Sequence, residues 1–313
     1  MTQVLALSGG IGGAKLAVGL QRVLFPGELT VAVNTGDDFE HLGLAISPDL
    51  DTMIYTLAGM QNPELGWGRA NESWNFMAEI ERLGGEHWFR LGDKDLAVHI
   101  ERTRRLNAGE KLSGITADFA RHFGILGKVV PMTNDLVRTM VVTDEGTLDF
   151  QHYFVGRRCE PAVKGLAYAG AADAQLVPFV QEAVEDPSLQ AIVICPSNPW
   201  LSIGPFLEMP AWRQLLVEAT VPVIAVSPLV NGQAVKGPTT KIMSELQLEQ
   251  SSATIARFYE GIIDGLVLDR SEAHLAPQIS MATHVTATLM KTATDKQRLA
   301  REVMDFARSF SKL

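Results

Sequence analysis

Hydrophobic and polar residues group along the chain into blocks that predict strands and helices in alternation. Residues 2–7 and 29–35 are short apolar runs, each followed by a glycine-rich or polar turn. Segments with helical periodicity come after them, at residues 14–23 and from about residue 51. This order is typical of an α/β fold built on a mostly parallel sheet.

Two later apolar runs support the same architecture. The segments QAIVICPSNP and VPVIAVSPLV end in proline and serine, as expected of parallel strands that are buried on both faces. Between them and the N-terminal part, LVRTMVVTDEGTLDFQHYFV alternates like a hairpin that turns at residues 144–146. We expect a doubly wound, Rossmann-like three-layer fold in which the loops SGGIGGAK, NTGDD, CPSNP and SPLVNG meet at the carboxyl edge of the sheet.

Residues 67–123 differ from the rest of the chain because helical periodicity dominates there and strand signals are few. The segments NESWNFMAEIERLG and HIERTRRLNAGEKL carry this pattern. We therefore predict a mainly helical insertion at residues 61–124 that contributes to the binding site. Residues 1–60 and 125–313 would form the α/β nucleotide-binding core.

Composition and charge exclude several classes of protein. The 313 residues are 46% hydrophobic, which suffices for a large core, and the net charge of −9 provides no basic field for nucleic acid. The two cysteines, Cys159 and Cys195, form no CxxC pair, so we expect packing residues rather than a zinc ribbon or a disulfide framework. The N-terminus lacks the features of a secretory leader, and no apolar stretch reaches eighteen residues. We expect a cytoplasmic protein with no membrane partner.

The stretch SGGIGGAK, at residues 8–15, predicts an anion site because unpaired backbone N–H groups at a helix start attract negative charge. It fits the common labels poorly: Leu16 stands where a Walker loop requires Ser or Thr after Lys15, and GxGxxG is matched only loosely. The alternative is a glycine turn that only packs the first helix on its strand.

Four acids cluster near the predicted start of the second helix, namely Asp37, Asp38, Asp49 and Asp51. Asp49 or Asp51 alone could simply cap the helix. Together with an anion loop, however, carboxylates and phosphate oxygens form the ligand set that Mg²⁺ prefers. The cluster therefore predicts a magnesium site.

The segment WFRLGDKDLAVHI offers a second group of functional candidates. Arg90, flanked by apolar neighbours that would partly hold it, suits a phosphate or a flat polar ligand. We expect Asp93 or Asp95 to cap the following helix, and His99 to pair with Asp95 one turn away in a structural role.

Two loops that follow predicted strands, CPSNPWLSIGP and SPLVNGQAVKGPTTK, are rich in turn residues. Turn chemistry explains each residue separately, but it does not explain why such loops recur at one edge of the sheet. Asn198 and Ser202 could read the polar edge of a base, while Lys236 and Gly237 could meet phosphates, as in a nucleotide site built from loops.

The order of these motifs resembles the 2-phospho-L-lactate transferase family, known as CofD or FbiA. The motifs that carry the resemblance are, in order, SGGxGGAK, VNTGDD, SPDLDTxxYTLAG, WGRANESW, WFRLGDKDLAxH, DFQHYFVGRR, PSNPxxSIGP and SPLVxGxAVKGP. The resemblance covers almost the whole chain. It implies an Mg²⁺-dependent enzyme that joins the deazaflavin FO to a phospho-acid from a guanosine-diphospho-acid. GMP would be released, in the biosynthesis of coenzyme factor 420. The acid could be of the 2-phospho-L-lactate, phosphoenolpyruvate or 3-phosphoglycerate type.

The resemblance also implies site residues. Asp51 and Arg90 fall on positions that bind FO, which the insertion would help to enclose, and an acid of the GDD or SPDLDT group falls on the metal. We assign Asp38 and Asp51 to Mg²⁺ and Asp51 to catalysis. The residues that fall on the guanosine nucleotide site are Gly9, Gly10, Gly12, Gly13, Lys15, Ser197, Asn198, Ser202, Lys236 and Gly237.

One departure and two rival functions accompany the resemblance. Asp149 stands where the family often has histidine, so we assign His152 no catalytic role. A homodimer is expected. A related non-catalytic regulator that binds a nucleotide sugar is the main alternative. An NAD-dependent enzyme is disfavoured because no acid ends a strand about twenty residues after a clean GxGxxG.

Overall fold

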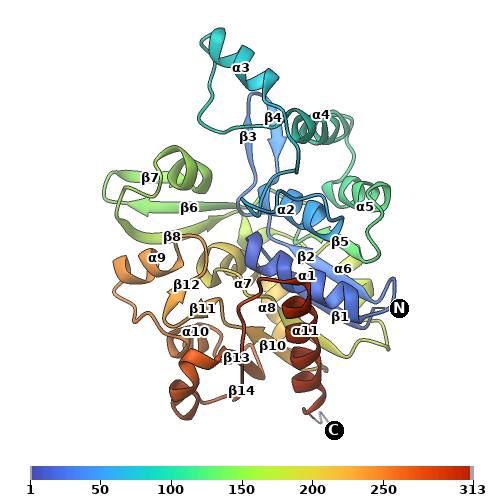
Figure 1. The fold of residues 1–313 in the computed structure, drawn as a ribbon, viewed down its shortest axis with the longest axis vertical. Coiled ribbons are helices and arrows are strands. Elements are labelled where there is room, and N and C mark those ends of the chain that lie inside the picture. Colours follow the sequence, from blue (N-terminus) through green and yellow to red (C-terminus); the bar gives the residue numbers. More distant parts are fainter. Residues whose placement is uncertain (1, 311–313) are drawn as a thin grey trace.

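A seven-stranded sheet forms the centre of the protein in a computed structural model that describes residues 2–310 (Figure 1). The strand order is β14-β13-β10-β9-β1-β2-β5, and each neighbouring pair runs parallel. The strands are β1 (Val4–Ser8), β2 (Leu29–Val33), β5 (Lys128–Pro131), β9 (Ala191–Ile194), β10 (Val223–Val226), β13 (Gly265–Asp269) and β14 (Ala282–Thr286). The predicted doubly wound α/β fold is confirmed.

The strand order reverses between β1 and β9, because β2 and β5 lie on one side of β1 while β9 begins the series on the other. Ligands of open parallel sheets bind outside the carboxyl ends of the strands at such a switch point. The chain is tightly packed here: a Cβ added to Gly12 would lie 2.3 Å from the carbonyl oxygen of Pro196. Glycine thus allows the first helix to approach the loop after β9.

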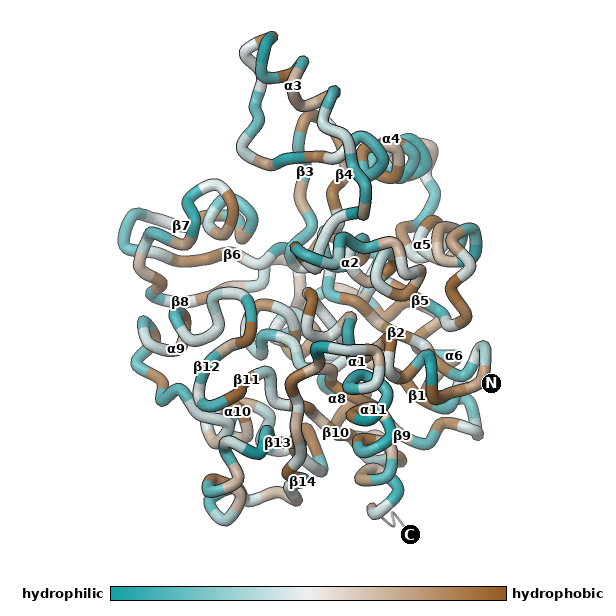
Figure 2. The backbone as a smooth tube through the Cα atoms, in the orientation of Figure 1, coloured by the Kyte–Doolittle hydropathy of each residue, from teal (hydrophilic) through white to brown (hydrophobic). Residues whose placement is uncertain are grey.

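Helices cover both faces of the sheet, and the alternation of side chains along β1 divides the core in two. Val4 and Ala6 pack under one layer, and Leu5 and Leu7 pack under the other. The first layer comprises α1 (Gly10–Val23), α2 (Pro48–Leu57), α5 (Leu112–His122) and α11 (Ala293–Arg308). The second comprises α6 (Pro178–Val184), α7 (Gly204–Glu208), α8 (Pro210–Val217) and α10 (Ser252–Phe258). Figure 2 shows the hydrophobic stretches concentrated in the central strands.

A second, antiparallel sheet in the order β7-β6-β8 flanks the first. Its strands are β6 (Arg138–Thr143), β7 (Gly146–Asp149) and β8 (Val163–Ala169), so the predicted hairpin turn is confirmed. The strand pattern expected beyond Asp149 is wrong, because residues His152–Gly156 form a helical turn. Tyr153 of that turn packs against Ile242 of α9 (Thr239–Glu245).

The predicted insertion contains α3 (Asn75–Arg82), α4 (Asp93–Asn107) and α5. In Figure 1, α3 stands at the end of the molecule furthest from β14, next to the hairpin of β3 (Phe39–His41) and β4 (Leu44–Ile46). Helix α5 instead packs on β5 and α2 in the core. The boundaries of the insertion as a separate unit therefore stay a prediction.

Two smaller expectations concern membranes and thiols. Within residues 2–310, no helix combines the length and the apolar character that crossing a membrane requires. Cys195 is buried in the core, where burial raises the pKa of its thiol to about 12, and Cys159 is half-buried. Both thiols are free, which agrees with the predicted packing role.

Candidate active site

A cavity of about 640 Å³ opens at the carboxyl edge of the sheet, over the switch point between β1 and β9. It collects residues from loops that are far apart in the sequence. The predicted site residues that line it are Gly9, Gly10, Gly12, Lys15, Asp51, Arg90, Ser197, Asn198, Ser202, Lys236 and Gly237. Gly13 and Asp38 are not among the described residues that line it.

The glycines belong to the first turn of α1, because this helix begins at Gly10 and not at Ala14 as predicted. The amide of Gly9 donates to Ser197 Oγ (3.1 Å), and the amide of Gly10 donates to Asp49 Oδ1 (2.8 Å). These two amides are therefore paired, whereas the sequence predicted unpaired N–H groups at this turn. The following first-turn amides have no partner within the helix. The amides that remain available to a bound anion therefore begin at Ile11, and an anion site here stays a prediction.

Two lysines add positive charge to this part of the cavity. Burial lowers the pKa of Lys15, and repulsion from Lys236 and Lys296 lowers it further. The ammonium of Lys236 donates to the carbonyl oxygen of Leu65 (2.7 Å), which lies on another loop at the cavity. An anion between Lys15 and Lys236 would relieve their repulsion, so the chemistry favours a phosphate here.

The carboxylates near the glycines are buried and unusually basic. Asp49 accepts hydrogen bonds from Gly10 and from Asn34 Nδ2 (3.0 Å), yet burial raises its pKa to about 6. Burial, together with repulsion from Asp49, raises the pKa of Asp37 well above its usual range. Among residues 2–310, Asp37 Oδ1 has no hydrogen-bond partner. This pair would gain from a bound cation.

Asp38 is buried but is not among the described residues that line the cavity. Its Oδ2 accepts a hydrogen bond from Ser47 Oγ (2.8 Å), and burial raises its pKa to about 7. Its other oxygen has no hydrogen-bond partner in the part of the chain that the structure describes. A metal role for Asp38 stays a prediction.

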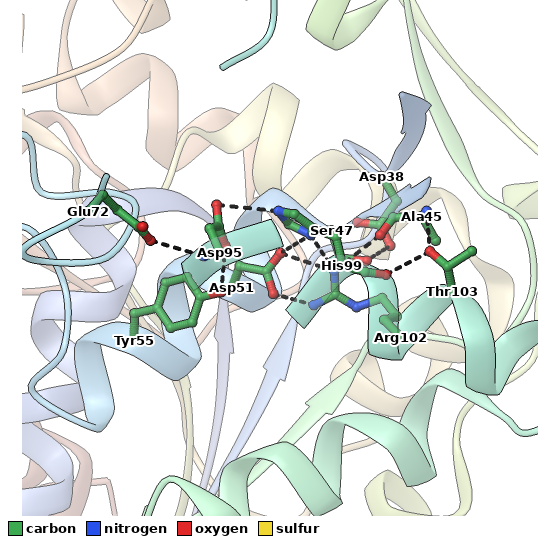
Figure 3. Close-up of polar contacts among 10 residues, drawn as sticks. All are labelled: Asp38, Ala45, Ser47, Asp51, Tyr55, Glu72, Asp95, His99, Arg102 and Thr103. Carbon is green, nitrogen blue, oxygen red and sulfur yellow. Dashed lines mark hydrogen bonds and ion pairs between the residues drawn. The ribbon is translucent and has the colours of Figure 1, made fainter. Parts of the chain in front are cut away.

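Asp51 is held by a network that joins α2 to α4 (Figure 3). Both of its oxygens accept hydrogen bonds from the guanidinium of Arg102. Nη1 donates to Oδ2 (3.1 Å), and Nη2 makes a second, shorter contact with Oδ1. His99 lies between two acids, its Nδ1 3.6 Å from Asp51 Oδ2 and its Nε2 3.3 Å from Asp95 Oδ2. Tyr55 donates its hydroxyl to Asp95 (2.5 Å). The predicted pairing of Asp95 with His99 is confirmed.

The predicted helix cap on α4 is wrong. Glu72 accepts hydrogen bonds from the amides of Lys94 (2.8 Å) and Asp95 (3.0 Å) at the start of α4, so it caps this helix from a distant loop. Asp93 caps a different helix: it accepts hydrogen bonds from Asn75 and Phe76 at the start of α3. These exchanged contacts hold α3 and α4 together.

An aromatic wall faces the carboxylates from the insertion and from the second sheet. Trp67, Trp88, Phe89, Phe150 and Phe154 line the cavity there. Arg90 is exposed and does not pack among its sequence neighbours as predicted, because its guanidinium lies 4.4 Å from the centre of the Trp74 ring. A flat ligand could therefore lie between an aromatic surface and a fixed cation.

Comparison with known proteins identifies the family to which this chain belongs. The family model for 2-phospho-L-lactate transferase CofD matches residues 4–308. The chain belongs to the CofD family of 2-phospho-L-lactate transferases. It is therefore a transferase, as the resemblance implied, and not an NAD-dependent enzyme or a non-catalytic regulator.

Members of the CofD family with curated names span nearly the full length of this chain. A 2-phospho-L-lactate transferase of Methanopyrus kandleri is 40% identical and is aligned over 95% of each chain. A phosphoenolpyruvate transferase of Streptomyces coelicolor is 36% identical, over 97% of this chain and 98% of its own. A solved structure from Bacillus halodurans, at 15% identity and a TM-score of 0.64 over 97% of this chain and 99% of that one, shares the fold.

Arg102 is a residue next to this CofD site that sequence reasoning missed, because it fixes the Asp51 carboxylate. It is only 1% exposed, although it lies in a strongly charged segment that is typical of a solvated helix face. One signal was available: Arg102 follows His99 by three residues and Val98 by four, which places it on the buried side of α4.

Proposed function

We propose that this CofD-family transferase moves a phospho-acid from a guanosine-diphospho-acid to the terminal ribityl hydroxyl of FO, in the biosynthesis of coenzyme factor 420. The single observation that supports this most is the cavity itself, in which a cationic glycine turn, buried carboxylates and an aromatic wall meet. The names of the relatives favour 2-phospho-L-lactate or phosphoenolpyruvate as the acid, with 3-phosphoglycerate as the third option. Cytoplasmic location and a homodimer stay predictions.

The donor would bind with its diphosphate against the start of α1. First-turn amides, Lys15 and Lys236 supply the positive charge that two phosphates need. To reach the phosphates, the Lys236 ammonium would exchange the Leu65 carbonyl for a phosphate oxygen. Donor binding would thus be coupled to the loop that carries Leu65 and Trp67.

The acceptor would lie on the opposite side of the cavity. The ring system of FO fits the aromatic wall formed by Trp88 and Phe89, with the guanidinium of Arg90 at its polar rim. Its ribityl chain would then point toward Asp51, whose carboxylate Arg102 holds in one orientation. This arrangement brings the hydroxyl to the phosphates without a covalent intermediate.

The chemistry is substitution at phosphorus. The ribityl oxygen bonds to the phosphorus that carries the acid, the bond from that phosphorus to the bridging oxygen breaks, and GMP leaves with the electron pair. Asp51 would orient the hydroxyl and accept its proton, which passes on to solvent. A loose transition state asks little of a base, so orientation and charge neutralisation supply most of the catalysis.

The carboxylates fit Mg²⁺, which prefers oxygen ligands and takes one or two acids together with waters and phosphate oxygens. Asp37 and Asp49 face the cavity beside the glycine turn, and their raised pKa values reflect buried charge that a cation would offset. We favour them over Asp38 and Asp51, since Asp51 is already paired with Arg102. When bound, Mg²⁺ supplies charge neutralisation at the diphosphate.

One other arrangement of ligand atoms deserves comparison. Asp51, Asp95 and His99 bring three of these atoms within 4.8 Å of one another. An imidazole suits Mg²⁺ less well than oxygen does, and the adjacent guanidinium of Arg102 would repel a cation. This group therefore serves better to fix Asp51 than to bind magnesium.

Product analysis tests the proposal. Purified protein would be incubated with FO, Mg²⁺ and each guanosine-diphospho-acid in turn, and the products analysed by mass spectrometry. We expect one donor to yield an FO phosphodiester that retains the acid. Failure of all three donors, with protein that still binds FO, would contradict the proposed reaction.

A further inference from the structure

Two hydroxyls that line the cavity come from loops after β10 and β14, and neither belongs to the predicted site. Ser227 directly follows β10, and Thr288 lies shortly after β14. Each is linked to a buried carboxylate that does not line the cavity. Ser227 is linked to Glu272 through the hydroxyl of Ser252, and Thr288 bonds directly to Asp269. These partners decide which hydrogen-bonding role each hydroxyl offers to a ligand.

The hydrogen of Ser227 is committed inside the protein. Glu272 is 3% exposed, and its Oε2 accepts the hydroxyl hydrogen of Ser252 at 2.5 Å. The 2.6 Å contact between the Ser252 and Ser227 oxygens must therefore use the hydrogen of Ser227. The amide of Leu229 donates to the same Ser227 oxygen (3.2 Å). What Ser227 can still offer is an acceptor lone pair.

The hydroxyl hydrogen of Thr288 also points into the protein. Its amide (2.9 Å) and its hydroxyl (3.1 Å) both donate to Asp269 Oδ2, while the amide and hydroxyl of Ser271 donate to Asp269 Oδ1. Burial acts to raise the pKa of Asp269, but the hydrogen bonds from Ser271 and Thr288 outweigh it and leave the pKa lowered. With an ionised partner, the Thr288 hydroxyl is a donor inward and an acceptor outward.

The position of these acceptors suits the base of a nucleotide. The carboxylates follow β2 along the chain, and α2, which carries Asp49 and Asp51, packs on β2. Strand β10 instead lies two strands away on the other side of β1. Neighbouring strands are about 4.8 Å apart, so Ser227 lies roughly 10 Å along the sheet from the end of β1. A diphosphate held at α1 would direct its nucleoside toward β10, because the reacting end must point toward Asp51.

We propose that Ser227 and Thr288 form an acceptor-only subsite that selects a guanine base through the N–H groups of its N1 and 2-amino positions. The inference rests on the proposed nucleotide donor and adds the source of its base specificity. Adenine presents an acceptor at its N1 position. Its N1 would therefore face the acceptor oxygen of a subsite hydroxyl, and neither atom would have a hydrogen-bond donor. Glu272 and Ser252 act as positioning residues that set the polarity of Ser227.

Equilibrium binding of GDP, IDP and ADP to the full chain, measured by calorimetry, tests this subsite. The wild type should prefer GDP to ADP, with IDP between them because it lacks the 2-amino group. Ser227→Ala and Thr288→Val should each weaken GDP about tenfold and leave ADP nearly unchanged, the effect of one lost hydrogen bond. Thr286→Val is the matched control, since the hydroxyl of Thr286 bonds to Glu302 and does not line the cavity.

Glu272→Gln provides a sharper test because it should reverse the relay. The amide of Ser252 donates to Glu272 Oε1 (3.3 Å), so the glutamine oxygen would face this fixed donor and its NH₂ would face the Ser252 hydroxyl. Ser252 would then donate to Ser227, and Ser227 would donate into the cavity. The preference for GDP over ADP should fall below that of Ser227→Ala.

The possible outcomes distinguish failure of the proposed nucleotide donor from failure of the guanine subsite. If the wild type binds no GDP, the proposed donor is wrong and the guanine subsite with it. If GDP binds but Ser227→Ala and Thr288→Val leave the GDP to ADP ratio unchanged, the subsite is refuted while the proposed function stands. Thermal melts confirm folding, and the two hydroxyl deletions decide the question even if Glu272→Gln does not fold.

Discussion

Removal of the Arg102 guanidinium should destabilise the protein strongly. The substitution Arg102→Met preserves much of the side-chain length but leaves the Asp51 carboxylate, only 5% exposed, without its bidentate partner. Breaking a buried pair by removing one partner costs about 3–5 kcal/mol, because the remaining charge stays buried without compensation. Asp38 lies close enough to Arg102 for the guanidinium to lower its pKa, so it loses the same support.

The cost can be expressed as a melting temperature. At about 2.1 cal/mol/K per residue, unfolding of a 313-residue chain carries an entropy of roughly 0.66 kcal/mol/K. A loss of 3–5 kcal/mol would therefore lower Tm by about 5–8 °C. Replacing both partners, as in Arg102→Met with Asp51→Leu, should recover much of this loss because no buried charge is left unpaired.

Thermal unfolding followed by circular dichroism provides the measurement. Arg104→Met is the matched control: Arg104 lies on the same helix and pairs with Glu101 on the exposed surface, where a pair contributes about 1 kcal/mol or less. The control should lower Tm by under about 2 °C. If Arg102→Met lowers Tm no more than the control does, the pair with Asp51 does not stabilise the fold as argued here.

Three further predictions concern the site directly. Asp51→Asn should lower turnover roughly a hundredfold or more at a temperature where the variant is still folded, although the lost charge opposite Arg102 should also lower its Tm; steady-state rates within about threefold of the wild type would contradict its role. Arg90→Ala should weaken FO far more than GDP, because Arg90 lines the cavity together with the aromatic wall; separate titrations that show equal losses would oppose this. Gly12→Ala should lower both Tm and GDP affinity, because the new methyl would lie 2.3 Å from the Pro196 carbonyl oxygen. Gly114→Ala, with open space around it in a helix, is its control and should not lower Tm.

The fold was predictable for most of the strands whose burial is continuous, although β13, which is equally buried, was not predicted. Strands β1, β2, β9 and β10 lie at the centre of the sheet, and their unbroken apolar runs identified them as parallel strands. Strands β5 and β14 lie at the edges, where exposed residues such as Lys128 and Ala282 interrupt the pattern. The turn at residues 152–156 was missed because its alternation continues that of β7 without a break.

The site was predictable where the backbone fixes it. Loops after parallel strands must meet at one edge of the sheet, so the glycine turn, Ser197 and Lys236 could be assigned to one cavity from sequence alone. Contacts between distant segments could not be assigned in this way. The pairing of Arg102 with Asp51 and the capping of α4 by Glu72 depend on how α2, α4 and the loop before α3 pack.

The fate of the diphosphate tests the central claim most directly. Protein, FO and the guanosine-diphospho-acid that proves active would be mixed, and the nucleotides and FO products separated by chromatography over time. The proposed attack at the acid-bearing phosphorus predicts one GMP for each FO phosphodiester, with only slow hydrolysis when FO is omitted. Release of GDP in step with product would place the broken bond at the ester oxygen of the acid and contradict this mechanism.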